Sequence, residues 1–133
     1  MESHHRLQQD RPWDVSRNLV ATLALESGAE WCFFWDSDVV IPPYTLTRLV
    51  MRGVPIAGGL YYRRHPEVWP EAFRYSGELL DPVSKRQLDD ETRARGTPFM
   101  EVDALGAGCL LVHRRVLEKM KAVVPKRSFV VKG

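Results

Sequence analysis

The sequence has few of the features that mark secreted or membrane-spanning proteins. Only two of its 133 residues are cysteines, Cys32 and Cys109, and both lie in apolar runs. We therefore expect reduced core cysteines in a cytoplasmic protein rather than a disulfide framework. No apolar run approaches the roughly 20 residues that a membrane-spanning helix requires. Residues 1–11 are polar and lack the apolar core of a signal peptide.

A large excess of one charge is also missing. The 19 basic residues outnumber the 17 acidic ones only slightly, which gives a net charge of +2. Because nucleic-acid-binding domains concentrate positive charge, this balance gives no support to a nucleic-acid partner. Apolar residues make up 44% of the chain, enough for a folded core. We expect one domain over residues 12–122, a flexible lead-in at 1–11 and a C-terminal tail at 123–133.

Hydrophobic periodicity predicts an α/β fold. Val15, Leu19 and Leu23 recur every four residues, which indicates an amphipathic helix. Gly28 is a suitable end for that helix, because glycine adopts the left-handed conformation common at helix ends. Five consecutive apolar residues at 31–35 then predict a strand covered on both faces, as in a parallel sheet.

The later chain predicts shorter elements in the order helix, strand, edge strand, loop, two strands and helix. The second helix starts at the Pro42-Pro43 pair and ends at Gly53, with an apolar face made by Leu46, Leu49 and Val50. The segments expected after it are a strand at 55–62, an edge strand at 73–80, a mobile loop at 81–97, strands at 99–104 and 107–113, and a helix at 114–122.

Two carboxylates directly follow the most apolar predicted strand. Asp36 and Asp38 stand two residues apart at its carboxyl end, where open α/β sheets bind their ligands. Such a pair can converge on one hard cation, Mg²⁺ or Mn²⁺. That cation can hold a diphosphate and stabilise its charge as it leaves. The competing interpretation is a polar turn in which Asp38 caps the next helix.

The sequence around these carboxylates resembles the metal-binding segment of family 2-like glycosyltransferases, within the nucleotide-diphospho-sugar transferase superfamily. The resemblance covers about residues 12–120 and depends on several segments in the right order. Those segments are the helix around Arg17-Asn18 to Ala24-Leu25, the run from Phe33 to Pro43, the strand from Pro55 to Tyr62, the segment from Val102 to Val112 and the helix at Arg114 to Leu117.

The resemblance implies a partial GT-A, Rossmann-like fold with a mixed central sheet flanked by helices. It implies transfer of a sugar from a UDP- or GDP-linked donor to a hydroxyl of a saccharide or other acceptor, with Mn²⁺ or Mg²⁺. Asp38 would bind the metal directly, and Asp36 would bind the ribose, or the metal through water. The further site residues would be Gly58, Gly59, Arg63, Gly106 and Gly108 beside the donor, and Asp103 facing the sugar as the catalytic group.

Each of these further residues also has a plain structural interpretation. The Gly58-Gly59 pair can mark a bulge in a strand, and the turn from Gly106 to Gly108 can simply join a hairpin. Asp103 can be a surface carboxylate. Arg63, whose guanidinium suits phosphate, can lie in a solvated loop.

The sequence also departs from the family pattern. Only 35 residues precede Asp36, which leaves no room for the strand-helix-strand unit that binds the nucleobase in family members. After Met120 the chain has no Asp or Glu that can serve as the general base. We therefore expect a domain truncated at both ends, either a truncated product or a fragment of a longer protein rather than a minimal variant. We also expect an exposed sheet edge that allows self-association.

Two other functions fit the same residues. Haloacid-dehalogenase-like phosphatases also place an Asp-x-Asp after an apolar strand, and Asp36 would then be the nucleophile. The second acidic pair of that family should follow an apolar strand, whereas Asp89-Asp90 lies in a polar segment. The other alternative is a non-catalytic fragment that binds a nucleotide or a partner chain.

Overall fold

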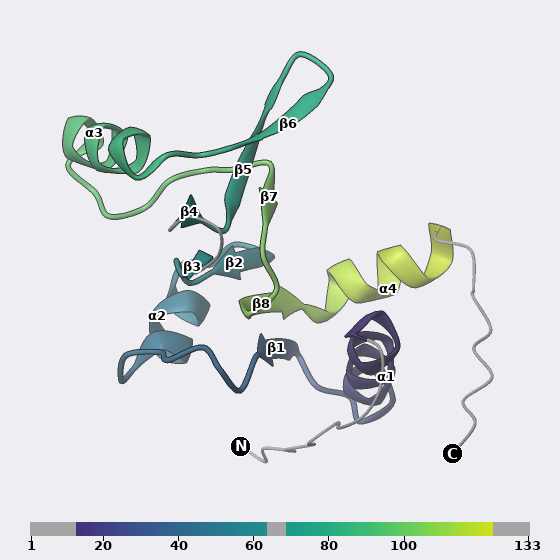
Figure 1. Cartoon of the computed structure of the whole chain (residues 1–133). Helices are drawn as coiled ribbons and strands as arrows, with labels where there is room; N and C mark the ends of the chain where they lie inside the picture. The colour runs from purple at the N-terminus through teal and green to yellow at the C-terminus, as the bar shows by residue number, and fades with distance from the viewer. Residues whose placement is uncertain (1–12, 64–68, 124–133) are drawn as a thin grey trace.

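The computed structural model describes residues 13–63 and 69–123, except for the side chains of residues 13–15, 63 and 69 (Figure 1). The helices are α1 (Trp13–Glu26), α2 (Thr45–Met51), α3 (Lys85–Arg95) and α4 (Arg114–Val123). The strands are β1 (Trp31–Trp35), β2 (Ile56–Gly58), β3 (Tyr62–Arg63), β4 (Trp69–Pro70), β5 (Ala72–Ser76), β6 (Leu79–Pro82), β7 (Ala104–Leu105) and β8 (Cys109–His113). Within this part of the chain no helix is long and apolar enough to cross a bilayer.

The central sheet has the strand order β1-β8-β2, and β8 pairs antiparallel with both neighbours. The small α/β protein expected from the sequence is confirmed, but the predicted parallel pairing of β1 is wrong. The expected mixed sheet is also not found, because every pairing among the described strands is antiparallel. β1 and β2 run in the same direction but are separated by β8. An apolar run predicts that both faces are covered, whereas strand direction depends on the partner.

Helices cover both faces of the central sheet. On one face, α1 and α4 pack on Cys32 and Val112 of the sheet, and α4 contributes the buried Leu117 to this cluster. On the other face, α2 packs through Leu49 on a cluster that includes Leu111. The predicted helices at the start of the chain and after β8 are therefore confirmed. Figure 1 shows α1 and α4 side by side.

Helix α2 differs from its prediction in its start and in its buried face. It begins at Thr45, two residues after the proline pair, because Tyr44 adopts a left-handed conformation with φ 65°. Leu49 is buried, but Leu46 is 43% exposed and Val50 is 36% exposed. A helix of less than two full turns presents only one residue squarely to the sheet.

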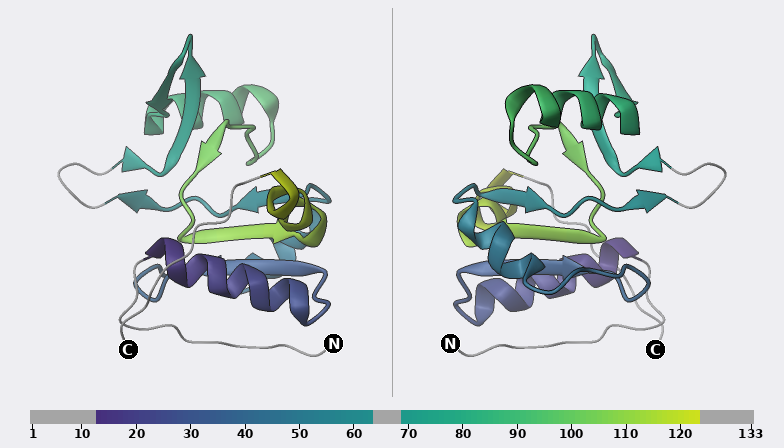
Figure 2. Two further views of the ribbon diagram at one scale, coloured as in Figure 1. Left: turned by 90° about the vertical axis from the view of Figure 1, so that its right-hand side faces the viewer. Right: turned by 90° about the vertical axis from the view of Figure 1, so that its left-hand side faces the viewer.

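A second sheet with the order β6-β5-β7 carries α3 at the other end of the molecule (Figure 2). The single edge strand predicted at 73–80 is a hairpin instead, because Gly77 turns the chain with φ 64°. The loop predicted at 81–97 is also wrong, because this segment contains α3. Ser84 and Gln87 form a reciprocal capping box at its start, and Gly96 ends it with φ 65°.

The predicted strand pair at 99–113 divides between the two sheets. β7 pairs with β5 in the second sheet, whereas β8 pairs with β1 and β2 in the central one. The segment from Gly106 to Gly108 is therefore no hairpin turn, and the hairpin interpretation is wrong. It carries the chain from one sheet to the other.

Both outer strands of the central sheet have an open edge within the described part of the chain. The bonds from Asp36 N to Gly108 O and from Arg114 N to Glu30 O fix which β1 residues face β8. By alternation, Trp31, Phe33 and Trp35 direct their backbone polar groups away from β8. No described strand pairs with that side. Self-association through this edge stays a prediction.

The two cysteines are core residues without a disulfide, as expected. Cys32 and Cys109 are buried and free. Burial raises the pKa of the Cys32 thiol to about 11, and it also raises the pKa of Cys109. Both thiols are therefore protonated and unreactive in the folded chain at neutral pH.

Leu111→Ala should destabilise the fold strongly, because Leu111 is fully buried at the centre of the middle strand. We expect the free energy of unfolding to fall by about 2–5 kcal/mol, as for other buried leucines. Leu79→Ala is the matched control, since Leu79 is 71% exposed and should change stability by less than about 0.5 kcal/mol. Urea unfolding of both variants measures the difference. Equal losses would contradict this account of the core.

Candidate functional site

The end of β1 is a tight turn held by backbone hydrogen bonds. The amide of Asp36 donates to the carbonyl of Gly108 at 3.0 Å, and the amide of Val39 donates to the carbonyl of Asp36 at 3.0 Å. The indole Nε1 of Trp35 also donates to the carbonyl of Val39 at 2.6 Å. The predicted site residues Asp36 and Gly108 are therefore adjacent in the structure.

The carboxylate of Asp36 forms an ion pair with Arg17 from α1. The Nη2 atom of Arg17 lies 3.3 Å from Oδ1 and 3.4 Å from Oδ2 of Asp36. The two side chains are 35% and 46% exposed, so solvent screens this pair. Asp38 is exposed and makes no hydrogen bond or ion pair within the described residues. A ligand can therefore reach both carboxylates of the motif.

Tyr61 connects this turn to the second sheet. Its hydroxyl oxygen accepts a hydrogen bond from the amide of Gly108 at 3.0 Å, and its carbonyl accepts one from the amide of Glu71 at 3.0 Å. Burial raises the pKa of Tyr61, and the nearby charges of Glu71 and Asp36 raise it further. The hydrogen bond from Gly108 and the charge of Arg17 oppose this rise. The phenol thus stays protonated beside the carboxylates.

The two glycines of the connecting segment make room for Tyr61. A Cβ atom on Gly106 would lie 2.1 Å from the Tyr61 hydroxyl oxygen, and one on Gly108 would lie 2.8 Å from Cζ of the same ring. Neither glycine has a positive φ, so space and not backbone conformation requires them.

Side chains of the core also fill the space at the glycine pair where β2 ends. A Cβ atom on Gly58 would lie 2.8 Å from Cδ1 of Leu105, and one on Gly59 would lie 2.6 Å from Sγ of Cys109. The amide of Gly59 continues the pairing with β8 by donating to the carbonyl of Cys109. Internal packing therefore accounts for these glycines, and their role in donor binding stays a prediction.

The chemistry of Asp36 and Asp38 fits a hard divalent cation that also has a phosphate ligand. No group of three or more His, Cys, Asp or Glu side chains that can hold a metal occurs within the described part of the chain. Mg²⁺ commonly binds through one or two carboxylates and completes its shell with water and substrate phosphates. The two carboxylates thus suit a cation that arrives with a diphosphate better than a cation held by protein ligands alone.

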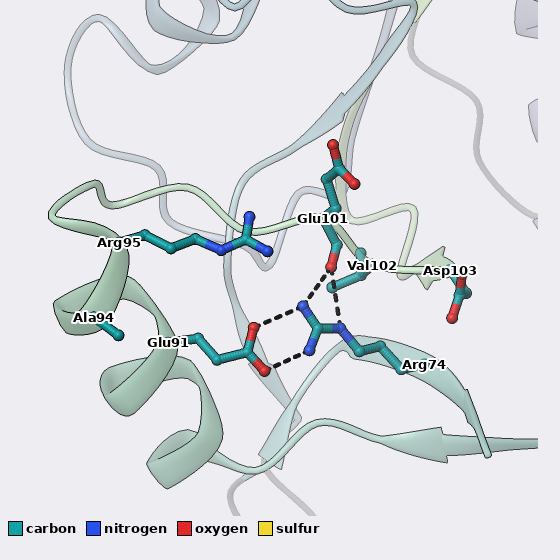
Figure 3. Close-up of a pocket in the computed structure, with 7 residues that line it drawn as sticks. All are labelled: Arg74, Glu91, Ala94, Arg95, Glu101, Val102 and Asp103. Atoms are coloured by element: carbon teal, nitrogen blue, oxygen red, sulfur yellow. Dashed lines mark hydrogen bonds and ion pairs between the residues drawn. The ribbon is translucent and has the colours of Figure 1, made fainter.

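Asp103 lies in a different place from the Asp36 turn. Its Oδ2 atom accepts a hydrogen bond from the amide of Tyr75 at 2.8 Å. It lines an open hollow of about 660 Å³ between α3, β5 and the segment before β7 (Figure 3). No described contact joins Asp103 to Asp36, and its role as the catalytic group stays a prediction.

An ion pair between Arg74 and Glu91 lines this hollow. Nη2 of Arg74 lies 2.8 Å from Oε2 of Glu91, Nη1 contacts the other oxygen, and two guanidinium nitrogens donate to the carbonyl of Glu101. The hydrogen bond from Arg74 lowers the pKa of Glu91. Arg95 extends into the same hollow in Figure 3, and its charge also lowers the pKa of Glu91. These contacts fasten α3 to β5, the connection that the sequence did not predict.

The described structure leaves the proposed phosphate-binding role of Arg63 untested, because its side chain lies outside the described residues. Sequence reasoning gave no role to Arg17 or Tyr61. Arg17 stands in the helix before the strand, and Tyr61 follows the glycine pair, but neither position shows a local signal. Their roles depend on contacts with residues far away in the sequence.

The sequence and the structure were compared with known proteins in three ways. A scan against protein-family models, a search of curated proteins and a search of solved structures each returned no match. The functional argument therefore depends on the site itself.

Gly106→Ala should destabilise the fold by about 1–3 kcal/mol through overpacking against Tyr61. Tyr61→Phe should relieve much of that loss, because it removes the hydroxyl oxygen that the new methyl group meets first. Gly108→Ala should gain less from Tyr61→Phe, because the ring carbon Cζ stays at 2.8 Å. Double-mutant cycles of unfolding free energies measure both couplings. Equal relief of the two variants would show that the hydroxyl is not the obstacle.

Glu91→Gln should lower stability at pH 7 and lose that effect in acid. Because the folded pKa of Glu91 is lowered, its ion pair stabilises the fold above the ordinary value of about 4.5. The contribution disappears as the pH falls through the lowered pKa. Urea unfolding of wild type and variant between pH 2.5 and pH 7 measures the difference. Asp90→Asn is the control, because the contact of Asp90 with Arg86 is exposed and 3.9 Å long. A pH-independent difference would contradict the assignment.

Proposed function

We propose that this domain binds a nucleotide-diphosphate-sugar through a divalent cation and takes part in transfer of the sugar to an acceptor hydroxyl. The observation that carries the proposal is the hydrogen bond from the amide of Asp36 to the carbonyl of Gly108. This bond holds the first residue of the Asp-x-Asp motif, whose carboxylates are accessible, beside the small-residue segment from Gly106 to Gly108. Both segments are among those that carry the sequence resemblance to glycosyltransferases.

The turn provides what cation-assisted diphosphate binding needs. Asp36 and Asp38 supply hard oxygen ligands, and the backbone of Asp36 is fixed by its bond to Gly108. Mn²⁺ or Mg²⁺ would supply charge stabilisation for the departing nucleotide. Tyr61 contacts the connecting segment through Gly108, and Arg17, which contacts Asp36, would offer a guanidinium to the phosphates. Positioning and charge neutralisation are therefore the contributions of the described residues.

Calorimetric titration of UDP and GDP into the chain, with and without Mn²⁺, tests this function directly. We expect binding that needs Mn²⁺ and that falls at least about tenfold in Asp38→Ala, since removal of one ligand from a two-carboxylate site weakens the hold on the cation. The nucleotide with the higher affinity identifies the donor class.

Asp89→Ala is the matched control, because Asp89 is an exposed carboxylate on α3 that lies away from the turn. It should bind as wild type does. If Asp38→Ala and Asp89→Ala lose the same nucleotide affinity, the effect comes from the change in net charge. A specific site at Asp38 would then be rejected. Absence of binding by folded wild-type chain would overturn the proposal and favour a partner-binding role. Aspartyl-phosphate formation at Asp36 would instead establish the phosphatase chemistry.

A further inference from the structure

The ion pair between Arg17 and Asp36 is asymmetric. A single guanidinium nitrogen, Nη2, contacts both carboxylate oxygens, at 3.3 and 3.4 Å. The fork-to-fork geometry of a strong arginine–carboxylate pair would use two nitrogens at shorter distances. Nε and Nη1 of Arg17 make no hydrogen bond or ion pair within the described residues. The guanidinium thus holds Asp36 loosely and keeps donors for another anion.

Arg17 also belongs to a helix whose backbone is held in place by packing. Helix α1 packs on the central sheet through Val20, Ala21 and Ala24, which follow Arg17 along the helix. The helix backbone is therefore held, while the Arg17 side chain is 35% exposed and can change its rotamer. Three charged groups act on the Tyr61 hydroxyl, those of Arg17, Asp36 and Glu71, and Arg17 carries the positive charge among them.

We propose that Arg17 exchanges partners when the site is filled, releasing Asp36 to the divalent cation and binding the diphosphate of the donor. This inference rests on the proposed function and adds the residue that couples cation binding to phosphate binding. A divalent cation at Asp36 repels the guanidinium from its present place. A phosphate held by that cation then offers the planar, bidentate partner that arginine prefers.

The exchange predicts that one substitution raises the affinity for the cation and lowers the affinity for the phosphate ligand. Arg17→Gln removes the charge that competes with the cation, so Mn²⁺ alone should bind more tightly, by roughly threefold to tenfold. Pyrophosphate and UDP in saturating Mn²⁺ should bind more weakly, by roughly tenfold or more, because a charge-assisted hydrogen bond is lost. Arg17→Lys keeps the charge without the fork, so Mn²⁺ affinity should stay near wild type while pyrophosphate affinity falls.

Calorimetry with Mn²⁺ alone, then with pyrophosphate and with UDP, measures these affinities. Arg48→Gln is the matched control, because Arg48 is an exposed arginine on α2, and it should change none of them. Circular dichroism melts establish that every variant is folded.

The outcomes separate this inference from the proposed function. Wild-type binding of UDP with Mn²⁺, together with unchanged affinities in Arg17→Gln, would overturn the exchange and leave the function standing. Weaker Mn²⁺ binding in Arg17→Gln would overturn it too, because Arg17 would then support the cation site. Absence of Mn²⁺ and nucleotide binding in both chains would overturn both proposals. If Arg17→Gln binds Mn²⁺ more tightly but neither chain binds pyrophosphate or UDP, Arg17 competes with the cation for Asp36 but does not bind the diphosphate. That result would overturn the exchange.

Discussion

The backbone pairing of β8 with strands on both of its sides is the constraint on which the rest of the structure depends. One set of alternating residues in and around β8 bonds toward β1, as in the pairing of Gly108 with Asp36. The other set bonds toward β2, as in the pairing of His113 with Pro55. Leu111 lies at the centre of this strand and is fully buried. The strands that α1, α2 and α4 cover are joined into one sheet through this strand.

The candidate site combines a fixed backbone with accessible side chains. Hydrogen bonds hold the amide and the carbonyl of Asp36, so the turn cannot shift without breaking the sheet. Its carboxylate, nearly half exposed, is free to change partners. Preorganised backbone and exchangeable charge suit a site that must bind and release an anionic ligand. The hollow at Arg74 has a different character, because Arg74 and Glu91 are already paired with each other.

The sequence predicted the elements whose signals are local. The apolar run of β1 and the four-residue periodicity of α1 identified both elements, and the pair Asp36 and Asp38 marked the turn after β1. Helix α3 escaped prediction because it buries no residue, and its one clear signal is the capping box of Ser84 and Gln87. Strand direction and the roles of Arg17 and Tyr61 depend on partners far along the chain. No window of neighbouring residues contains that information.

The contact of Tyr61 with Gly106 and Gly108 has a consequence for how this protein can change over generations. Each glycine is confined by the same aromatic ring, so a larger residue at either position is tolerated only after the ring has become smaller. A smaller residue at position 61 first leaves an unfilled space and an amide without its acceptor. A substitution at one of these positions therefore depends on the residues at the other two. We expect positions 61, 106 and 108 to change together or not at all.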